Sequence, residues 1–437
     1  MRRKTKDLSA HCPLPTAHSA VKRPSWAEVD LGALTHNYGI LRELLVPGAH
    51  DFGLRIADFG LNNEGQSAIR NPKSAMRSPR LIPVVKANAY GHGAVPVARA
   101  LSAAGATAFA VALVEEGVEL REAGVREEIL VLEGAWPGQE AELVRHRLTA
   151  TVYSAEGVRR LDREARSAPA PVRTHIKVDT GMSRLGVAWD AMDELLESLQ
   201  NSPALEVTGV FSHLACAEDE DTDYTCEQIR RFHYALDNMR SSGMDPGEVH
   251  FANSGGLLYC PALRASSARP GIALYGYPPA PERCRLDFKP VLTLKSRIGR
   301  IHTIRAGESA GYNRRFVAAR DTRAATLPVG YADGYNRRLS CLGRVIVGGR
   351  WAKVLGAVSM DTIVVDITDL PGVREEDEAI LLGSTPECRM DAAIWADLLE
   401  TIPYEVLCGI SPRVPRIFTR VPPPHRLILE HTELIHP

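Results

Sequence analysis

The chain of 437 residues is long enough for two or three domains, and 45% of its residues are hydrophobic, as in an ordinary globular protein. Its 52 basic and 53 acidic residues nearly cancel, so neither a nucleic acid nor a membrane surface is indicated as a partner. The eight cysteines include no CxxC pair, and residues 1–25 are basic without the apolar segment of a secretory signal. We therefore expect a cytoplasmic enzyme with reduced thiols.

The first predicted elements are a strand at Trp26–Leu31 and a helix at Leu34–Leu44. Residues 48–80 follow, rich in Gly, Asn, Arg and Ser and without a hydrophobic period. We interpret them as an inserted surface loop.

Between Leu81 and Tyr275, short apolar runs alternate with longer helical segments. Strands that alternate with helices predict a parallel sheet, and eight such units in roughly 195 residues predict a closed (β/α)8 barrel. An open doubly wound sheet is the alternative, but no G-x-G-x-x-G motif follows any of the strands. The predicted strands are Ile82–Lys86, Ala108–Val114, Glu128–Leu132, Thr149–Tyr153, Thr174–Val178, Thr208–His213, Val249–Ala252 and Pro270–Leu274. The helices between them include Pro137–Arg147, Ala155–Arg166, Asp190–Leu199, Asp223–Ser241 and Gly255–Leu263.

After Pro278 the pattern changes to short apolar runs separated by Gly, Asp and Asn turns, with one helical stretch at Met390–Thr401. This pattern predicts a second domain that is mostly β. The predicted strands of this domain are Leu292–Ile298, Ala324–Pro328, Arg344–Val347, Ala352–Ala357 and Thr362–Asp366.

These patterns divide the chain into an α/β barrel domain at 26–280, which carries the 48–80 insertion, and a mostly β domain at 281–421. Residues 1–25 form an N-terminal extension and residues 422–437 a Pro-rich tail.

Functional residues of such a barrel lie at the C-terminal ends of its strands. The first strand ends at Lys86, within the sequence VVKANAYGHG. A lysine held at a strand end among apolar neighbours can form a Schiff base with an aldehyde, and pyridoxal phosphate is the common partner. Taken alone, Lys86 would more often be a solvated strand end.

Further polar residues follow the later strands. Lys177 and Asp179 end the fifth strand, and Arg184 lies in the turn after it; Ser212-His213 end the sixth strand. Ser254-Gly255-Gly256 open a helix after the seventh strand, where backbone N–H groups can hold a phosphate, although an N-cap serine in a tight turn is the simpler interpretation. Arg269-Pro270-Gly271-Ile272 lie in the eighth unit.

Together these motifs resemble the alanine racemase family of barrel-type, fold type III pyridoxal phosphate enzymes. The resemblance runs from about Trp26 to Arg420, with 48–80 as an insertion. The matching motifs stand in family order: VVKANAYGHG, HIKVDTGMSRLG, FSHLA, ANSGG, RPGIALYG, AGYNRRF, PVGYADGYNR, GAVSMD and PYEVLC…RVPR.

The resemblance implies a role for each matching residue. Lys86 would carry the cofactor and act as one catalytic base, and Tyr312 would be the other. Arg184 and the backbone N–H of Met360 would bind the substrate carboxylate, and Lys177 corresponds to a lysine that is often carbamylated. The cofactor-binding residues beside Lys86 would be Tyr90, His213, Ser254, Arg269, Gly271, Ile272 and Tyr404. Tyr331, Arg337 and Asp361 would belong to the entrance channel.

In the family Tyr312, Tyr331 and Met360 come from the partner subunit, which implies a head-to-tail homodimer with a shared active site. No metal is implied. Two bases on opposite faces suit the removal and return of the α-proton, and positive charge from Arg269, relayed through His213, would favour the phenolate of Tyr312. The implied activity is the interconversion of L- and D-alanine, with D-alanine supplied to peptidoglycan.

Three alternatives stay open. A serine or broad-specificity racemase would share the same motifs. A pyridoxal phosphate carrier on the same barrel would lack the β domain, and a non-catalytic descendant would lack Lys86 or Tyr312. Barrel-type decarboxylases place a carboxylate where this chain has Arg269.

Overall fold

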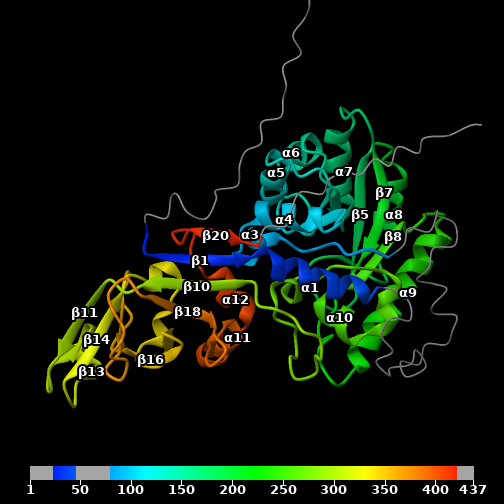
Figure 1. The fold of residues 1–437 in the computed structure, drawn as a ribbon. Coiled ribbons are helices and arrows are strands. Elements are labelled where there is room, and N and C mark those ends of the chain that lie inside the picture. The colour runs from blue at the N-terminus through cyan, green and yellow to red at the C-terminus, as the bar shows by residue number, and fades with distance from the viewer. Residues whose placement is uncertain (1–22, 46–78, 421–437) are drawn as a thin grey trace, which may run out of the picture. The chain divides into compact units, whose positions relative to one another are not determined.

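The computed structural model describes residues 23–45 and 79–420, which form two compact units, each described separately here (Figure 1). The first, the barrel unit, contains Asp30–Leu292 and Asp391–Ser411. The second, the β unit, contains the chain up to Val29, Thr293–Met390 and Pro412–Thr419. The predictions for the extension before residue 23, the 48–80 insertion up to residue 78 and the 422–437 tail fall outside the described residues.

The barrel unit is a closed ring of eight parallel segments. Seven of them are strands: β2 (Ala108–Val111), β3 (Glu128–Val131), β4 (Ala150–Val152), β5 (Val172–Asp179), β7 (Leu205–Phe211), β8 (Glu248–Ala252) and β9 (Ser267–Ala268). The eighth segment, around Leu81–Val84, joins the ring through parallel bridges to Ala268 on one side and Ala110 on the other. The bridge between Leu130 and Thr149 connects β3 to β4, so the predicted (β/α)8 fold is confirmed.

The eighth predicted strand, Pro270–Leu274, is wrong. Strand β9 lies just before it, and Ile272–Tyr275 form the 3-10 helix η3 instead. The Pro270 carbonyl still accepts a hydrogen bond from Val84 N at 2.9 Å, but a proline has no N–H to continue the ladder. The first strand also ends early, because Lys86 already begins a helical turn.

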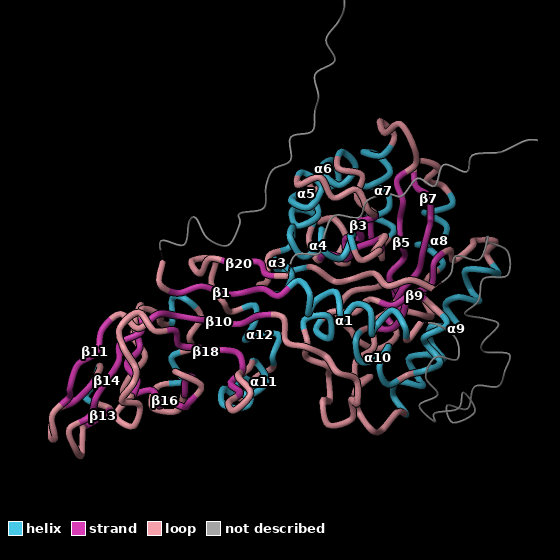
Figure 2. Tube along the Cα trace, in the orientation of Figure 1, coloured by secondary structure: helices cyan, strands magenta, loops and turns pink. Residues whose placement is uncertain are grey.

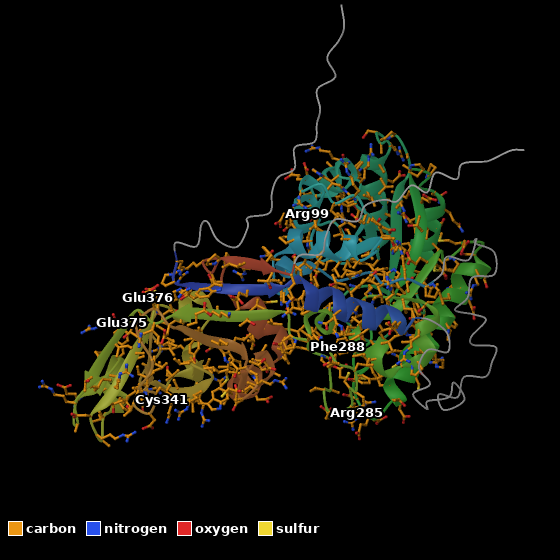
Figure 3. The ribbon with its side chains drawn as sticks, in the orientation of Figure 1. Arg99, Arg285, Phe288, Cys341, Glu375 and Glu376 are labelled. Carbon is orange, nitrogen blue, oxygen red and sulfur yellow. The ribbon has the colours of Figure 1, made fainter. Side chains whose placement is uncertain are left out.

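Helices surround the strands of the barrel unit (Figure 2). Helix α7 shows why they form, since Ser154 caps its first turn and the residues that it buries, among them Val158 and Leu161, recur at helical spacing. Arg99 of α4 is labelled in Figure 3. Its guanidinium donates to the carbonyl of Ala123 at the end of α5 and so connects two of the helices. The helices of this unit are α1 (Leu31–Glu43), α3 (Lys86–Tyr90), α4 (Ala94–Ala103), α5 (Val114–Glu122), α6 (Glu140–Arg145), α7 (Ala155–Ala165), α8 (Asp193–Gln200), α9 (Asp223–Ser241), α10 (Ser254–Tyr259), α11 (Ala392–Leu399) and α12 (Pro403–Cys408).

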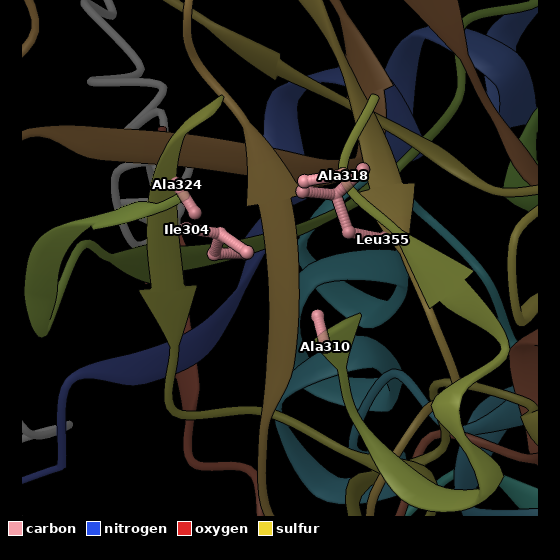
Figure 4. Packing of buried hydrophobic residues seen from close by; sticks show 5 residues of the cluster. All are labelled: Ile304, Ala310, Ala318, Ala324 and Leu355. Carbon is pink, nitrogen blue, oxygen red and sulfur yellow. The ribbon is translucent and has the colours of Figure 1, made fainter. Parts of the chain in front are cut away.

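The β unit is built on a largely antiparallel sheet in the order β11-β14-β17-β16-β15-β18-β10-β1-β20. Its strands are β1 (Ser25–Asp30), β10 (Leu292–Arg297), β11 (Arg300–Ile304), β14 (Thr322–Leu327), β15 (Arg344–Val347), β16 (Arg350–Leu355), β17 (Ile363–Asp366), β18 (Glu378–Ser384) and β20 (Arg416–Thr419). Part of the core of this unit is a buried apolar cluster of Ile304, Ala310, Ala318, Ala324 and Leu355 (Figure 4).

The units differ from the predicted domains at two places. Strand β1 belongs mainly to the β unit because it lies between β10 and β20 in the sheet, not in the barrel. Helices α11 and α12 belong to the barrel unit, where Tyr404 packs against Tyr90 with ring centroids 5.9 Å apart. Among the described residues, none of the helices combines the length and hydropathy that crossing a bilayer requires.

Candidate active site

Lys86 begins a turn of unusual handedness. The four residues after it, Ala87 to Tyr90, have φ between 51° and 54°, which is the left-handed helical region. L-residues disfavour this conformation by roughly 1–2 kcal/mol each, so the surrounding structure must hold it. Strain of this kind is typical of functional sites, because it fixes a side chain in one place.

Side chains pin this turn from both sides. Asn88 Oδ1 accepts a hydrogen bond from Ala94 N at 2.7 Å, which fixes the start of α4. Glu116, in the first turn of α5, accepts from Ala87 N at 2.6 Å with one carboxylate oxygen and from Ala112 N at 2.8 Å with the other. The residue next to Lys86 is thereby tied to the end of β2.

Ser254 and Gly271 form a small cradle beside Tyr90. Asn253, not Ser254, caps α10, with Oδ1 accepting from Gly256 N at 2.9 Å. The Ser254 hydroxyl instead accepts from Gly271 N at 3.0 Å. A Cβ on Gly271 would lie 3.2 Å from Tyr90 Cζ and closer still to its hydroxyl, so only glycine allows this approach. Hydroxyl and backbone N–H groups at the start of a short helix suit a phosphate.

Ile272 begins η3 directly after Gly271, and Tyr404 stands on α12 beside Tyr90. Burial raises the pKa of Tyr404 to about 12 and that of Tyr90 further still, so both stay protonated and can donate to a phosphate. The five residues predicted to hold the phosphate therefore lie together in the barrel unit.

The predicted cations of the barrel rim also lie close enough to act on one another. Burial, together with the neighbouring Arg269 and Arg184 charges, lowers the pKa of His213 to about 3. Burial and the Arg184 charge lower the pKa of Lys177 to about 8, and Lys86 contributes to both shifts. A concentration of positive charge of this kind suits a ligand with two anionic groups, such as a phosphate and a carboxylate.

Arg269 is buried with neutral partners only. Its Nη2 donates to the Ser212 carbonyl at 2.6 Å, and its Nη1 donates to the His250 carbonyl and Nδ1, each at 2.7 Å. Burial lowers its pKa to about 9. No acceptor within the described chain takes its Nε–H. A donor left over at this position fits the pyridine nitrogen of pyridoxal phosphate in its unprotonated form, which accepts a hydrogen bond.

The loop that carries Arg184 is fixed from two directions. Asp179 Oδ1 accepts from Gly181 N at 2.8 Å and from Ser183 N at 3.1 Å. The Tyr224 hydroxyl of α9 donates to the Gly181 carbonyl at 2.8 Å. Arg184 therefore extends from a braced turn and not from a free loop.

The remaining predicted residues lie in the β unit. Tyr331 N donates to the Ser359 carbonyl and Ala332 N to the Met360 carbonyl, each at 3.0 Å, so two of these loops are joined. Tyr312, Tyr331 and Met360 all expose large parts of their side chains, Tyr312 as much as 67%. Exposed aromatic and methionine side chains are typical of surfaces that bind another molecule. Arg337 begins the 3-10 helix η6 (Arg337–Leu339), and Asp361 pairs with Arg413 at 2.7 Å.

Sequence reasoning missed Glu116 and His250. Glu116 follows the end of β2, so its place at the barrel rim was available as a signal. His250 lies between apolar residues in a predicted strand, which marked it as an inward-facing polar residue. Their partners became visible only in the structure.

Comparison with known proteins agrees with this geometry. The family model described as alanine racemase, N-terminal domain matches residues 66–279, and the C-terminal domain model matches residues 291–418. The alanine racemase of Syntrophobacter fumaroxidans is 41% identical over 89% of this chain and 95% of its own length. That of Symbiobacterium thermophilum is 40% identical over 91% and 97%.

Solved structures give the same result. The alanine racemase of Bacillus anthracis with bound L-Ala-P matches with a TM-score of 0.79 and 31% identity, over 92% of this chain and 96% of that one. The enzyme from D-cycloserine-producing Streptomyces lavendulae matches with a TM-score of 0.77 and 33% identity, over 91% and 98%. The chain therefore belongs to the alanine racemase family and is an amino-acid racemase that uses pyridoxal phosphate.

Proposed function

We propose that the protein interconverts L- and D-alanine with Lys86 and Tyr312 as its two bases, and that a second copy of the chain supplies Tyr312. The observation that supports this most is the buried Arg269, whose hydrogen-bond partners within the described residues are all neutral and which, like Lys86, acts on the pKa of His213. An arginine there favours racemisation over the reactions for which relatives use a carboxylate.

Pyridoxal phosphate, when bound, withdraws electrons from the substrate and makes the proton on its α-carbon acidic. Arg269 would donate a hydrogen bond to the ring nitrogen and, with a pKa of about 9, stays protonated at neutral pH, which would keep this withdrawal moderate and disfavour side reactions. Lys86 Nζ moves the α-proton on one face of the substrate. Tyr312 Oη moves it on the other face.

His213 links these groups. A guanidinium has donors only, so Arg269 Nη2, 3.4 Å from His213 Nδ1, requires that nitrogen to accept. The single proton of neutral His213 then lies on Nε2, from which it can donate to the Tyr312 oxygen. Such a hydrogen bond stabilises the phenolate and prepares Tyr312 to act as a base.

Arg184 and the Met360 N–H would bind the substrate carboxylate. Lys177 would carry a carbamate that neutralises part of the charge on Arg184. Its lowered pKa supports this, since a larger fraction of the neutral amine is available to react with carbon dioxide at neutral pH.

The dimer is proposed because Tyr312, Tyr331 and Met360 are exposed in the β unit. A second copy of the chain is the occupant that the two-base chemistry needs, because a racemase must serve both faces of its substrate. We further propose that the enzyme works in the cytoplasm, where D-alanine is used to build peptidoglycan precursors.

A serine or broad-specificity racemase remains the second candidate, since such an enzyme would share the same motifs. The test is to incubate purified protein with L-alanine and pyridoxal phosphate and follow optical rotation, with L-serine in parallel. Decay to zero with alanine alone supports the proposal, and decay with serine alone refutes it. A bound-cofactor absorbance without racemisation of either would favour a carrier protein.

A further inference from the structure

A line of buried polar side chains leads from Arg269 into the barrel interior. Arg269 Nη1 lies 2.7 Å from His250 Nδ1, and His250 Nε2 lies 2.8 Å from His175 Nδ1. His175 Nε2 in turn faces Glu128 Oε1 at 3.7 Å. The two histidines are almost fully buried and come from different strands, β8 and β5. We name these four residues the column.

Hydrogen-bond chemistry fixes the proton positions along the column. Arg269 can only donate, so His250 Nδ1 accepts and the His250 proton lies on Nε2. His175 Nδ1 must then accept, and the His175 proton lies on Nε2, facing the Glu128 carboxylate. Burial lowers the pKa of His175 to about 4 and that of His250 well below its usual value, so each ring carries one proton at neutral pH.

At the end of the column away from Arg269 lie two carboxylates, those of Glu128 and Glu248. Arg80 Nη2 pairs with Glu128 Oε2 at 2.8 Å and with Glu248 Oε2 at 2.5 Å. Glu128, His175 and Glu248 have the spacing of a metal site. Two arguments oppose a metal there: the inferred tautomer places a proton on His175 Nε2, and Arg80 and Arg173 already balance the two carboxylates.

Phe211 forms a wall along the column. Its ring stacks on His250 with centroids 4.8 Å apart and an interplanar angle of 12°, and the Arg269 guanidinium lies 4.9 Å from its centroid. Both histidines are almost fully buried, so a lost hydrogen bond in the column is not easily replaced by water.

We propose that His175 and His250 are positioning residues. His175 accepts from His250 Nε2, which keeps His250 Nδ1 as the acceptor for Arg269, and this orients Arg269 towards the cofactor ring. The inference rests on the proposed function of the site. Without an acceptor at His175, His250 would lose the partner of its Nε2–H, and a shift of the proton to Nδ1 would place donor against donor at Arg269. Either result would move the guanidinium that would hold the cofactor ring.

Two substitutions at His175 separate hydrogen bonding from packing. In His175→Asn, the amide oxygen can replace Nδ1 as acceptor but much of the ring volume is lost. In His175→Phe, the ring volume is kept but the acceptor is lost. The readout is the rate at which diluted holoenzyme releases cofactor, followed by the absorbance of the bound form.

We expect His175→Phe to release cofactor about tenfold faster than wild type, since a buried donor is left unpaired, and His175→Asn to stay within about threefold. The same order in kcat, with little change in KM, supports positioning. The proposal is overturned if His175→Asn releases cofactor faster than His175→Phe, or if both variants release it at the wild-type rate. His233→Phe and His233→Asn, on the outer helix α9, are matched controls and should change neither rate.

A second measurement uses the wild-type holoenzyme, so its result does not depend on whether the variants fold. Neutron diffraction should show the proton on Nε2 of both His250 and His175, and a proton on His175 Nδ1 would refute the column. If the wild type failed to racemise alanine while His175→Phe still released cofactor faster, the proposed function would fall and this inference would stand.

Discussion

The approach of Gly271 to Tyr90 gives a sharp prediction about the phosphate cradle. In Gly271→Ala the new methyl group would stand 3.2 Å from Tyr90 Cζ and within the contact distance of the Tyr90 hydroxyl. Gly271 has φ of −114°, which is not the left-handed region that favours glycine, so the prediction concerns the contact of the new methyl group with Tyr90. The Tyr90 hydroxyl must retreat by on the order of 1 Å to restore contact distance.

Tyr90 cannot retreat freely. Its ring packs against Tyr275 with centroids 4.8 Å apart, and its backbone belongs to the left-handed turn after Lys86. Overpacking of this kind costs about 1–3 kcal/mol, which corresponds to roughly a 5- to 150-fold loss of cofactor affinity if the cost falls on the bound form. The assay is titration of the cofactor-free variant with pyridoxal phosphate, followed by absorbance.

The double variant identifies the cause. Tyr90→Phe removes the hydroxyl that the methyl group meets, so Gly271→Ala should cost clearly less in that background. An equal cost in both backgrounds would refute the steric reasoning. Gly39→Ala, at a helical position with open space around the new methyl group, is the control and should leave cofactor affinity unchanged.

Four further predictions follow from the site. Lys86→Ala should lose the bound-cofactor absorbance and racemisation together, and retained racemisation would remove Lys86 as the anchor. Tyr312→Phe should keep cofactor binding but lose most racemisation in a polarimetric assay, whereas a near wild-type rate would contradict the two-base assignment. Glu116→Ala should lower the free energy of unfolding by about 1–3 kcal/mol in denaturant titrations, because it leaves the Ala87 and Ala112 N–H groups without their carboxylate; exposed Glu115→Ala is the matched control. The pKa of His175 is about 4 in the folded protein and near 6.5 in the unfolded protein. Between these pH values the unfolded state therefore binds more protons, and the free energy of unfolding should fall as the pH drops from 6.5 towards 4. Thermal unfolding should show a smaller loss over that range in His175→Asn than in the wild type.

The sequence by itself determined the alternation of strands and helices, and it predicted where along the chain the candidate site residues lie. Hydrophobic periodicity predicted α9 to its last residue and placed Lys86, Lys177 and His213 at strand ends, because local patterns follow from which faces are buried. Hydrophobic periodicity wrongly placed the eighth strand at Pro270–Leu274. The apolar residues of this segment are buried in a 3-10 helix, and burial in a strand would give the same sequence pattern.

Only the tertiary structure decided the interactions between distant segments. The left-handed turn after Lys86 has no signature in Ala-Asn-Ala-Tyr, because it is imposed by partners such as Glu116, 29 residues away. The contact of His175 with His250 spans 75 residues, and no local pattern encodes which nitrogen must accept. That choice is made by Arg269, whose burial among neutral acceptors follows from closure of the barrel.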